Sequence, residues 1–300
     1  MDLNNKKALV ILNASAGTGK APANKQIIID KLNDHGFETK VFQILSDSYL
    51  ISDISLPSDY IPGLILCCGG DGTLNQTTNR FIKNDPEPVF AYLPFGNTDS
   101  FAGSLGIPED LDQALDAALN GIPYSCDTGT VNGSYFNFVA SFCAAPALNF
   151  ATSQQMKKVF EYAKYVLRAI GELHMNIGNG FDMAIESGTG SFEGNYIFGA
   201  ISNLSKIDGI NLFDESFSNN DGVMDLFLIK TPGSSSEARE VLNVLREGSL
   251  DHPLISTSRI TEGSFTSPAD IAWSLDGEFA GVYKESKLKV IRESLKIMTP

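Results

Sequence analysis

The sequence lacks several features that would assign it to common protein classes. No apolar run approaches the roughly 20 residues that a membrane-spanning helix needs, and the polar start enters an apolar segment too short for a signal-peptide core. The four cysteines form no C-x-x-C pair and the three histidines lie far apart, which argues against a zinc site or a disulfide framework. We therefore expect a cytoplasmic globular protein.

Basic residues are also few. The 22 Lys and Arg residues face 36 Asp and Glu residues, which gives a formal net charge of −14 at pH 7. An acidic surface repels nucleic acid, because nucleic-acid binding depends largely on the neutralisation of phosphates. The sequence thus predicts no nucleic-acid partner. A membrane lipid as partner would require a local basic or apolar docking face.

What the first third does contain is an alternation of strands and helices. Apolar runs predict strands, and the periodic segments between them predict helices. The predicted strands cover 7–13, 38–45, 63–68 and 89–93, and the predicted helices follow Pro22, start near Leu74 and cover 111–120. This order implies a parallel sheet with helices on both faces. Ligands of such sheets bind at the carboxyl ends of the strands, where the loops 13–19, 69–73 and 94–98 should lie.

From about residue 122 the pattern changes to short strands with Gly, Asn and Ser turns. Strands are expected at 134–140, 182–186, 195–202, 224–230 and 259–265, with helices at 156–175 and 234–246. We expect an N-terminal α/β domain (1–123) and a C-terminal β-sandwich or barrel-like domain (124–293). The strand-like segment 287–298 would bring residues 294–300 back to the first domain.

The loop Gly69-Gly70-Asp71-Gly72-Thr73 lies between a predicted strand and a predicted helix. Glycines let a backbone approach phosphate closely, and the helix start behind them offers free N–H groups and a positive dipole end. Asp71 cannot attract phosphate, so it fits a place near Mg²⁺ or a hydroxyl. A tight structural turn is the alternative. The nearby segment 16–20 fails as a P-loop, since Ala21 stands where Ser or Thr is required.

Residues 69–75 (GGDGTLN) resemble the glycine-rich core of the diacylglycerol kinase catalytic-domain family, which includes bacterial lipid kinases, sphingosine kinases and ceramide kinases. Four further blocks are similar to that family in the same order: 13–17 (NASAG), 94–102 (PFGNTDSFA), 220–225 (NDGVMD) and 276–278 (DGE). The resemblance covers almost the whole chain. It implies a nucleotide-binding α/β domain like that of NAD kinases and phosphofructokinases.

The resemblance also implies a set of site residues. ATP would lie along Asn13, Ser15, Gly17, Gln43, Gly69, Gly70, Asp71, Gly72, Thr73, Asn75, Gly96 and Asn97. Asp71 would organise Mg²⁺, and Asp276 would be the general base or its near partner, with Glu278 the other candidate. A structural Mg²⁺ would be held by Asp221 with the carbonyls of Ser218 and Val223. A hairpin turn without metal is the alternative for that loop.

Some positions depart from the family pattern. Ala14 replaces the usual proline, and Asn97, Asp99 and Ser100 replace Thr, Asn and Asp. Cys143 stands near a position where relatives often have glycine. The form G-N-T-D is closer to the G-S-T-D of ceramide-kinase-like members, although so short a match does not define the substrate.

The sequence therefore predicts an ATP-dependent kinase of a lipid hydroxyl, with diacylglycerol or a related lipid as substrate. Transient contact with a membrane surface is expected, and the predicted helix 156–175 has an apolar side that could provide it. One alternative is a small-molecule kinase similar to NAD kinase, and another is a non-catalytic protein that binds lipid or nucleotide. The oligomeric state is left open, with a homodimer as one option.

Overall fold

A computed structural model describes residues 5–17, 19–45, 51, 54–84, 86–97, 99–143, 180–203, 206–207, 210–211 and 218–300. The chain divides into two compact units, residues 1–126 with 293–300 (unit 1) and residues 127–292 (unit 2). The predicted helix 156–175 lies outside the described residues, as does Thr98. No helix in the described part of the chain is long and apolar enough to cross a membrane.

Unit 1 contains a parallel sheet. Its elements are β1 (Lys7–Asn13), a 3-10 turn (Pro22–Asn24), α1 (Lys25–Asp34), β2 (Glu38–Ile44), β3 (Leu64–Gly69), α2 (Asp71–Phe81), β4 (Val89–Pro94), α3 (Ser100–Ser104) and α4 (Leu111–Asn120). The strands are ordered β2, β1, β3, β4, and all neighbours are parallel. The end of β15 (Glu278–Thr299) adds a further parallel strand beside β4, where Ile297 pairs with Phe90.

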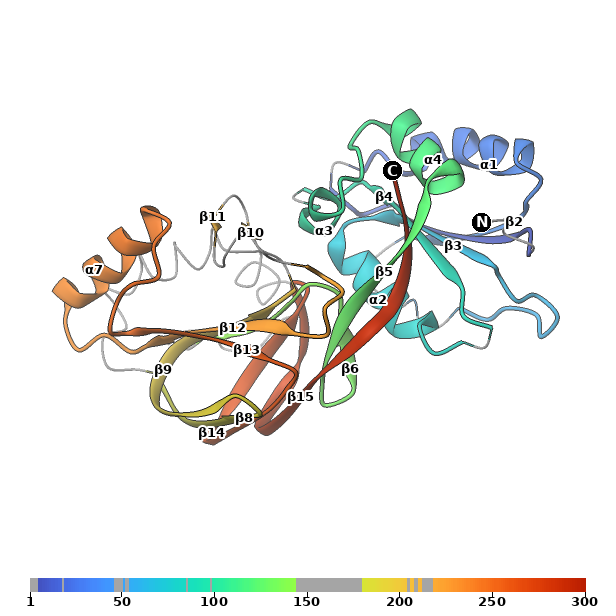
Figure 1. Cartoon of the computed structure of the whole chain (residues 1–300). Coiled ribbons are helices and arrows are strands. Elements are labelled where there is room, and N and C mark those ends of the chain that lie inside the picture. The colour runs from blue at the N-terminus through green and yellow to red at the C-terminus, as the bar shows by residue number, and fades with distance from the viewer. Residues whose placement is uncertain are drawn as a thin grey trace. The chain divides into compact units, whose positions relative to one another are not determined.

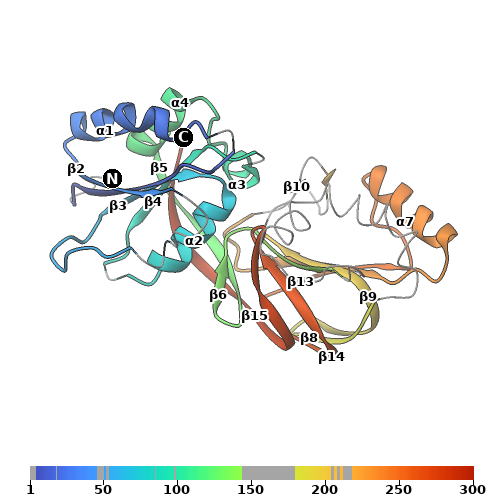
Figure 2. The ribbon, with the colours of Figure 1, turned by 180° about the vertical axis from the view of Figure 1, so that it is seen from behind.

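Helices cover both faces of this sheet, as the βα alternation predicts. Helices α1 and α4 lie on one face and α2 on the other (Figures 1 and 2). Alternate residues of the strands pack under α1 and α4, because successive side chains of a strand point to opposite faces. The strands β1, β3 and β4 are buried on both faces, which explains why they read as continuous apolar runs.

Unit 2 is rich in antiparallel strands. The strand β5 (Ile122–Val131) leads into β6 (Ser134–Phe136), β7 (Val139–Cys143), β8 (Phe181–Ser187), β9 (Gly190–Ser202), β10 (Lys206–Ile207), β11 (Ile210–Asn211), β12 (Met224–Lys230), α7 (Ser235–Arg246), β13 (Ile255–Ile260), β14 (Glu262–Leu275) and β15. The strand β9 pairs with both β7 and β8, and β14 also pairs with both. These four pairings close a ring, so this part of the unit is barrel-like.

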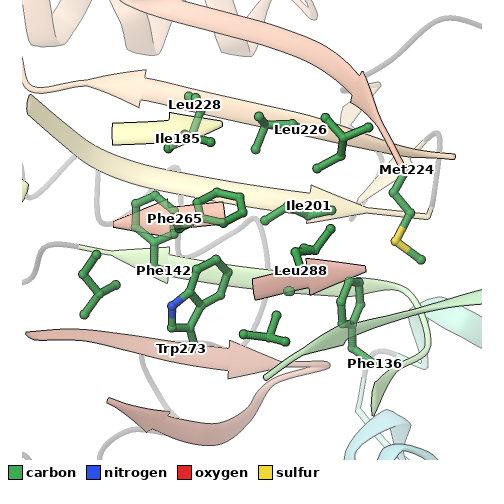
Figure 3. Close-up of a cluster of buried hydrophobic side chains, with 14 of the residues drawn as sticks. Phe136, Phe142, Ile185, Ile201, Met224, Leu226, Leu228, Phe265, Trp273 and Leu288 are labelled. Atoms are coloured by element: carbon green, nitrogen blue, oxygen red, sulfur yellow. The ribbon is translucent and has the colours of Figure 1, made fainter. Parts of the chain in front are cut away.

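The core of unit 2 lies inside this arrangement of strands (Figure 3). Phe142, Phe265 and Trp273 come from β7 and β14 and contact one another edge to face. Trp273 is fully buried. The sequence prediction of an α/β part followed by a β-rich part is confirmed at this level.

Several predicted boundaries differ from the structure. The helix predicted near Leu74 begins at Asp71, because Gly70 has extended backbone angles and precedes the first helical turn directly. The strand predicted over 134–140 is interrupted at Asn137 and Phe138. The strand predicted over 259–265 is two strands that meet at Thr261. Such breaks do not follow from the pattern of apolar and polar residues, because this pattern does not show where one strand ends and the next begins.

Candidate functional site

Glycine backbones bring three loops of unit 1 together at the carboxyl ends of β1, β3 and β4. A Cβ atom on Gly17 would collide with the carbonyl oxygens of Phe95 and Gly96, and one on Gly70 would lie 3.2 Å from the Gly96 Cα. The Phe95 N–H donates to the Gly69 carbonyl at 2.8 Å. The loops therefore meet through their main chains, which only residues without a side chain allow.

A side-chain hydrogen bond ties the first loop to the second. Asn13 Nδ2 donates to Thr73 Oγ1 at 2.9 Å, and Asn13 Oδ1 accepts from the Ser15 N–H at 2.9 Å. Gly69 leaves the room for Thr73, since a Cβ there would lie 2.5 Å from the Thr73 hydroxyl oxygen. These contacts fix the loop after β1 against the first turn of α2.

Asp71 is the first residue of α2 and is only 5% exposed. Its Oδ2 accepts from the Ser100 N–H at 2.9 Å, and its Oδ1 accepts from the Phe101 N–H at 3.4 Å and the Tyr92 hydroxyl at 3.3 Å. The carboxylate thus caps the start of the short helix α3. In this geometry Asp71 holds the loop after β4 in place.

Asp99 and Tyr92 belong to the same cluster, although the sequence did not mark them as site residues. Asp99 Oδ1 accepts from the Tyr92 hydroxyl at 2.8 Å and from the Gly96 N–H at 3.0 Å. Asp99 has left-handed backbone angles (φ 44°), which Asp tolerates better than most residues. The sequence signal that could have revealed this cluster is the Tyr92 hydroxyl in the otherwise apolar strand β4. A buried Tyr hydroxyl usually needs a hydrogen-bond partner.

Burial dominates the electrostatics of this cluster. It raises the pKa of Asp99 to about 6, although the hydrogen bond from Tyr92 acts in the opposite direction, and the nearby charge of Asp71 raises it further. Burial, together with the charges of Asp71 and Asp99, also raises the pKa of Tyr92 well above its ordinary value. Tyr92 therefore keeps its hydroxyl proton, and can donate a hydrogen bond, to a higher pH than an ordinary tyrosine.

The other predicted nucleotide residues lie around these loops. Gln43 is near the carboxyl end of β2 and pairs with Leu12 of β1, and Asn75 is buried in α2. Ser15 and Asn97 are exposed on the loops after β1 and β4. The structure thus brings all the predicted nucleotide residues to one edge of the unit 1 sheet.

In unit 2, Asp276 and Gly277 form the two-residue turn between β14 and β15. Both have left-handed backbone angles (φ 51° and 85°), and Leu275 pairs with Glu278 across the turn. Glu278 begins β15 and is partly buried. Two-residue turns between strands usually lie at the surface, but Asp276 is only 2% exposed.

The Asp276 carboxylate binds the break between β6 and β7. Its Oδ2 accepts from the Asn137 N–H at 2.6 Å, and its Oδ1 accepts from the N–H groups of Phe138 and Val139, each at 3.0 Å. The Asp276 N–H donates to the Val139 carbonyl at 2.8 Å. These bonds fix the position of the carboxylate and explain why the strand predicted over 134–140 is interrupted.

The predicted metal loop lies before β12. Asp221 Oδ1 accepts from the Val223 N–H at 3.2 Å, whereas its Oδ2 pairs with Arg259 of β13 at 2.5 Å. Ser218 Oγ donates to Asn220 Oδ1 at 2.6 Å. The guanidinium of Arg259 already neutralises Asp221, so this arrangement does not fit a cation at Ser218, Asp221 and Val223 without displacement of Arg259.

A buried polar group that the sequence did not single out supports this loop. Asp127 is fully buried, and its Oδ2 accepts from the Gly222 N–H at 2.5 Å. Asn203, also fully buried, donates to the Asp127 carbonyl at 2.8 Å. Among the described residues, no three His, Cys, Asp or Glu side chains are placed to hold a metal together.

The edge of unit 1 has the chemistry of a phosphate site. The first turn of a helix leaves N–H groups without helical partners, and α2 begins there behind the glycines. Glycines at 17, 70 and 96 keep the main chains of these loops close together at the start of this helix, because a Cβ at any of them would run into a neighbouring loop. The residues present therefore fit the triphosphate of a nucleotide.

Comparison with known proteins agrees with this chemistry. Residues 7–131 match the model of the diacylglycerol kinase catalytic domain. A protein of Bacillus subtilis named diacylglycerol kinase is 25% identical over 280 residues, which cover 92% of this chain and 91% of that protein. One of the same name from Staphylococcus carnosus is 22% identical over 298 residues, which cover 98% of this chain and 95% of that protein.

Solved structures are similar in fold. A crystal structure described as a diacylglycerol kinase from Bacillus anthracis matches with a TM-score of 0.71, and another from that organism matches with 0.78. Each is 18% identical and covers 98% of this chain and 97% of its own. Residues 7–131 thus match the diacylglycerol kinase catalytic domain, and the whole chain is similar to bacterial proteins named diacylglycerol kinase.

Proposed function

We propose that the chain transfers the γ-phosphate of ATP to the hydroxyl of a lipid, with diacylglycerol as the leading acceptor. The observation that carries the proposal is the junction of glycine loops at Gly17, Gly70 and Gly96, next to the start of α2. A kinase that acts on an alcohol follows from the family. The lipid acceptor is supported by relatives named diacylglycerol kinase that are similar over more than nine-tenths of this chain.

Unit 1 would hold the nucleotide. Asn13 and Thr73 fix the loops, and the N–H groups of the first turn of α2 would bind phosphate oxygens. Mg²⁺, when bound with ATP, would neutralise charge on the phosphates during transfer. Carboxylate oxygens are suitable ligands for this ion, and the cluster around Asp71 contains them.

The turn between β14 and β15 would supply the base. A base has to accept the proton of the lipid hydroxyl as that oxygen attacks the γ-phosphate. Asp276 is held rigidly by three backbone N–H groups, which supports a fixed position for a reacting carboxylate. Glu278 is the other candidate, because it begins β15 directly after the turn and is partly buried.

The decisive assay is transfer of labelled γ-phosphate from ATP to a panel of dispersed lipids. The panel contains diacylglycerol, monoacylglycerol, ceramide and sphingosine, with NAD as a control acceptor. We expect label in diacylglycerol or a related lipid, and its loss in Glu278→Gln or Asp276→Asn according to which residue is the base. Label in NAD alone would contradict the lipid assignment, and ATP binding without transfer to any acceptor would indicate a binding protein.

Because the acceptor is a lipid, the protein should also make transient contact with a membrane surface. Flotation with vesicles that contain diacylglycerol tests this contact directly. Co-migration with those vesicles is expected. Equal recovery in the lipid-free fraction, with and without vesicles, would contradict it.

A further inference from the structure

We propose that Asp99, and not Asp71, is the carboxylate of unit 1 that faces the bound nucleotide and its Mg²⁺. Asp71 then acts as a positioning residue, which differs from the sequence prediction. This inference rests on the proposed function, because it names the residue that meets the charge of the nucleotide. It depends on three observations, namely the partners of each carboxylate, the place of Asp99 between the glycine loops, and the bond from Tyr92.

Asp71 is fully engaged inside unit 1. Its two oxygens accept hydrogen bonds from the N–H groups of Ser100 and Phe101 and from the Tyr92 hydroxyl, and its side chain is buried. To meet a ligand, this carboxylate would have to give up the bonds that cap α3. Such a loss would release the loop that carries Gly96.

Asp99 is engaged through one oxygen only. Oδ1 accepts from Tyr92 and from the Gly96 N–H, whereas Oδ2 has no hydrogen-bond partner among the residues that the structure describes. The residue is partly exposed and has left-handed backbone angles. A carboxylate with one hydrogen-bonded oxygen and one unbonded oxygen is the arrangement expected of a ligand for a cation.

The Asp99 carboxylate also lies where two glycine loops meet. A Cβ on Gly96 would collide with Asp99 Oδ1, and one on Gly70 would lie 3.8 Å from the same oxygen. Any phosphate bound at these loops would therefore be close to a negative charge. A cation between the phosphate and Asp99 converts this repulsion into attraction.

Tyr92 fixes Asp99 from inside the sheet. Its hydroxyl lies 2.8 Å from the anchored oxygen of Asp99 and 3.3 Å from Asp71, so its hydrogen bond to Asp99 is the stronger of the two. The ring is 1% exposed and cannot reach a ligand itself. Tyr92 is therefore a positioning residue that holds the anchored oxygen of Asp99.

The test measures ATP affinity by calorimetry, with Mg²⁺ and with EDTA, and uses the ratio of the two affinities as the readout. Asp99→Asn keeps an oxygen that can accept from Tyr92 and Gly96 but removes the charge. We expect this variant to reduce the Mg²⁺-dependent gain in affinity by at least about tenfold, with Mg²⁺-free ATP bound as well as or better than by wild type. Tyr92→Phe should reduce the same ratio by a smaller factor.

Two further variants distinguish the effect of the Asp99 charge from effects of lost structure or of a lost surface charge. Asp71→Asn should weaken ATP binding equally with and without Mg²⁺ and lower the Tm, because it disturbs the cap of α3. Asp112→Asn removes one exposed charge on α4 and should change neither affinity nor ratio. The inference would be overturned if Asp99→Asn left the ratio of ATP affinity with Mg²⁺ to that with EDTA unchanged. It would also be overturned if only Asp71→Asn abolished the gain in affinity that Mg²⁺ gives. Both outcomes would leave the proposed kinase intact. A wild-type protein that binds no ATP would overturn both.

Discussion

At the scale of single residues, two aspartates with left-handed backbone angles hold main-chain segments in place, one in each unit. Asp99 in unit 1 and Asp276 in unit 2 both accept hydrogen bonds from main-chain N–H groups. Non-glycine residues adopt these angles rarely, and they do so mainly where surrounding contacts over-determine the conformation. Both residues therefore combine a structural role with the role that we propose for them in chemistry.

The structural role of Asp276 leads to a stability prediction. Asp276→Ala would leave buried N–H groups of Asn137, Phe138 and Val139 without their acceptor, so we expect the free energy of unfolding to fall by about 2–4 kcal/mol. Chemical denaturation measures this change. The matched control is Asp270→Ala on the same strand, whose exposed side chain should contribute less than about 0.5 kcal/mol. Equal stability of the two variants would show that the three bonds are not formed.

The raised pKa of Asp99 leads to a pH prediction for the protein without nucleotide or metal. The pKa is about 6 in the folded protein and near 3.8 when unfolded, so the native state binds the proton more tightly between these values. The resulting stabilisation is fully present below pH 3.8 and is lost as the pH rises through 6. From pH 7.5 to 4.5, wild type should gain about 1–2 kcal/mol relative to Asp99→Asn, an amount reduced for solvent screening.

Urea denaturation of both proteins at the two pH values checks this expectation. Other groups titrate in the same range, and the difference between wild type and variant cancels their contribution. A constant difference in the free energy of unfolding at pH 7.5 and 4.5 would contradict the assignment of the shift to Asp99.

At the scale of elements, the close approach of loops limits which glycines can be replaced. Gly96→Ala would place a methyl group 2.8 Å from the Gly70 Cα and against Asp99 Oδ1, so we expect nucleotide binding to be lost and the Tm to fall. Gly103→Ala is the matched control in α3, where a methyl group meets nothing within 4 Å. Its Tm should be unchanged or slightly higher. Similar affinities for ATP in both variants would argue against contact of the loops.

The bounds of helices and strands that carry one strong local signal in the sequence agree best with the prediction. Residues 111–120 form α4 and residues 224–230 form β12, as predicted. The periodic apolar face of α4 and its N-cap Asp110, which accepts from the Gln113 N–H, explain the first case. The break between β6 and β7 was not predictable, because its cause is a carboxylate that follows nearly 140 residues later.

At the scale of the whole molecule, unit 1 is built from both ends of the chain. The end of β15 lies beside β4, and Leu295, Ile297 and Met298 are buried in unit 1. The chain must therefore be synthesised to its last residues before this sheet is complete. Contacts of such high sequence separation form slowly, because the loop between them has to close first.

This arrangement predicts a distant effect on the nucleotide site. Ile297→Ala removes a fully buried side chain from the sheet of unit 1 and should cost about 2–4 kcal/mol. The temperature at which a bound fluorescent nucleotide is released should fall accordingly. Lys289→Ala on the same strand, exposed and in unit 2, is the control and should leave that temperature unchanged. Equal release temperatures for the two variants would contradict a role of this strand in unit 1.

The sequence by itself determined the α/β part, the β-rich part and the glycine loops at the carboxyl ends of the strands, because periodicity and glycine motifs depend on neighbouring residues. Only the tertiary structure decided what each carboxylate contacts. Asp71 caps α3, Asp99 is held by Tyr92, and Asp221 pairs with Arg259. These partners come from other strands and helices, and no spacing along the chain fixes how distant elements meet.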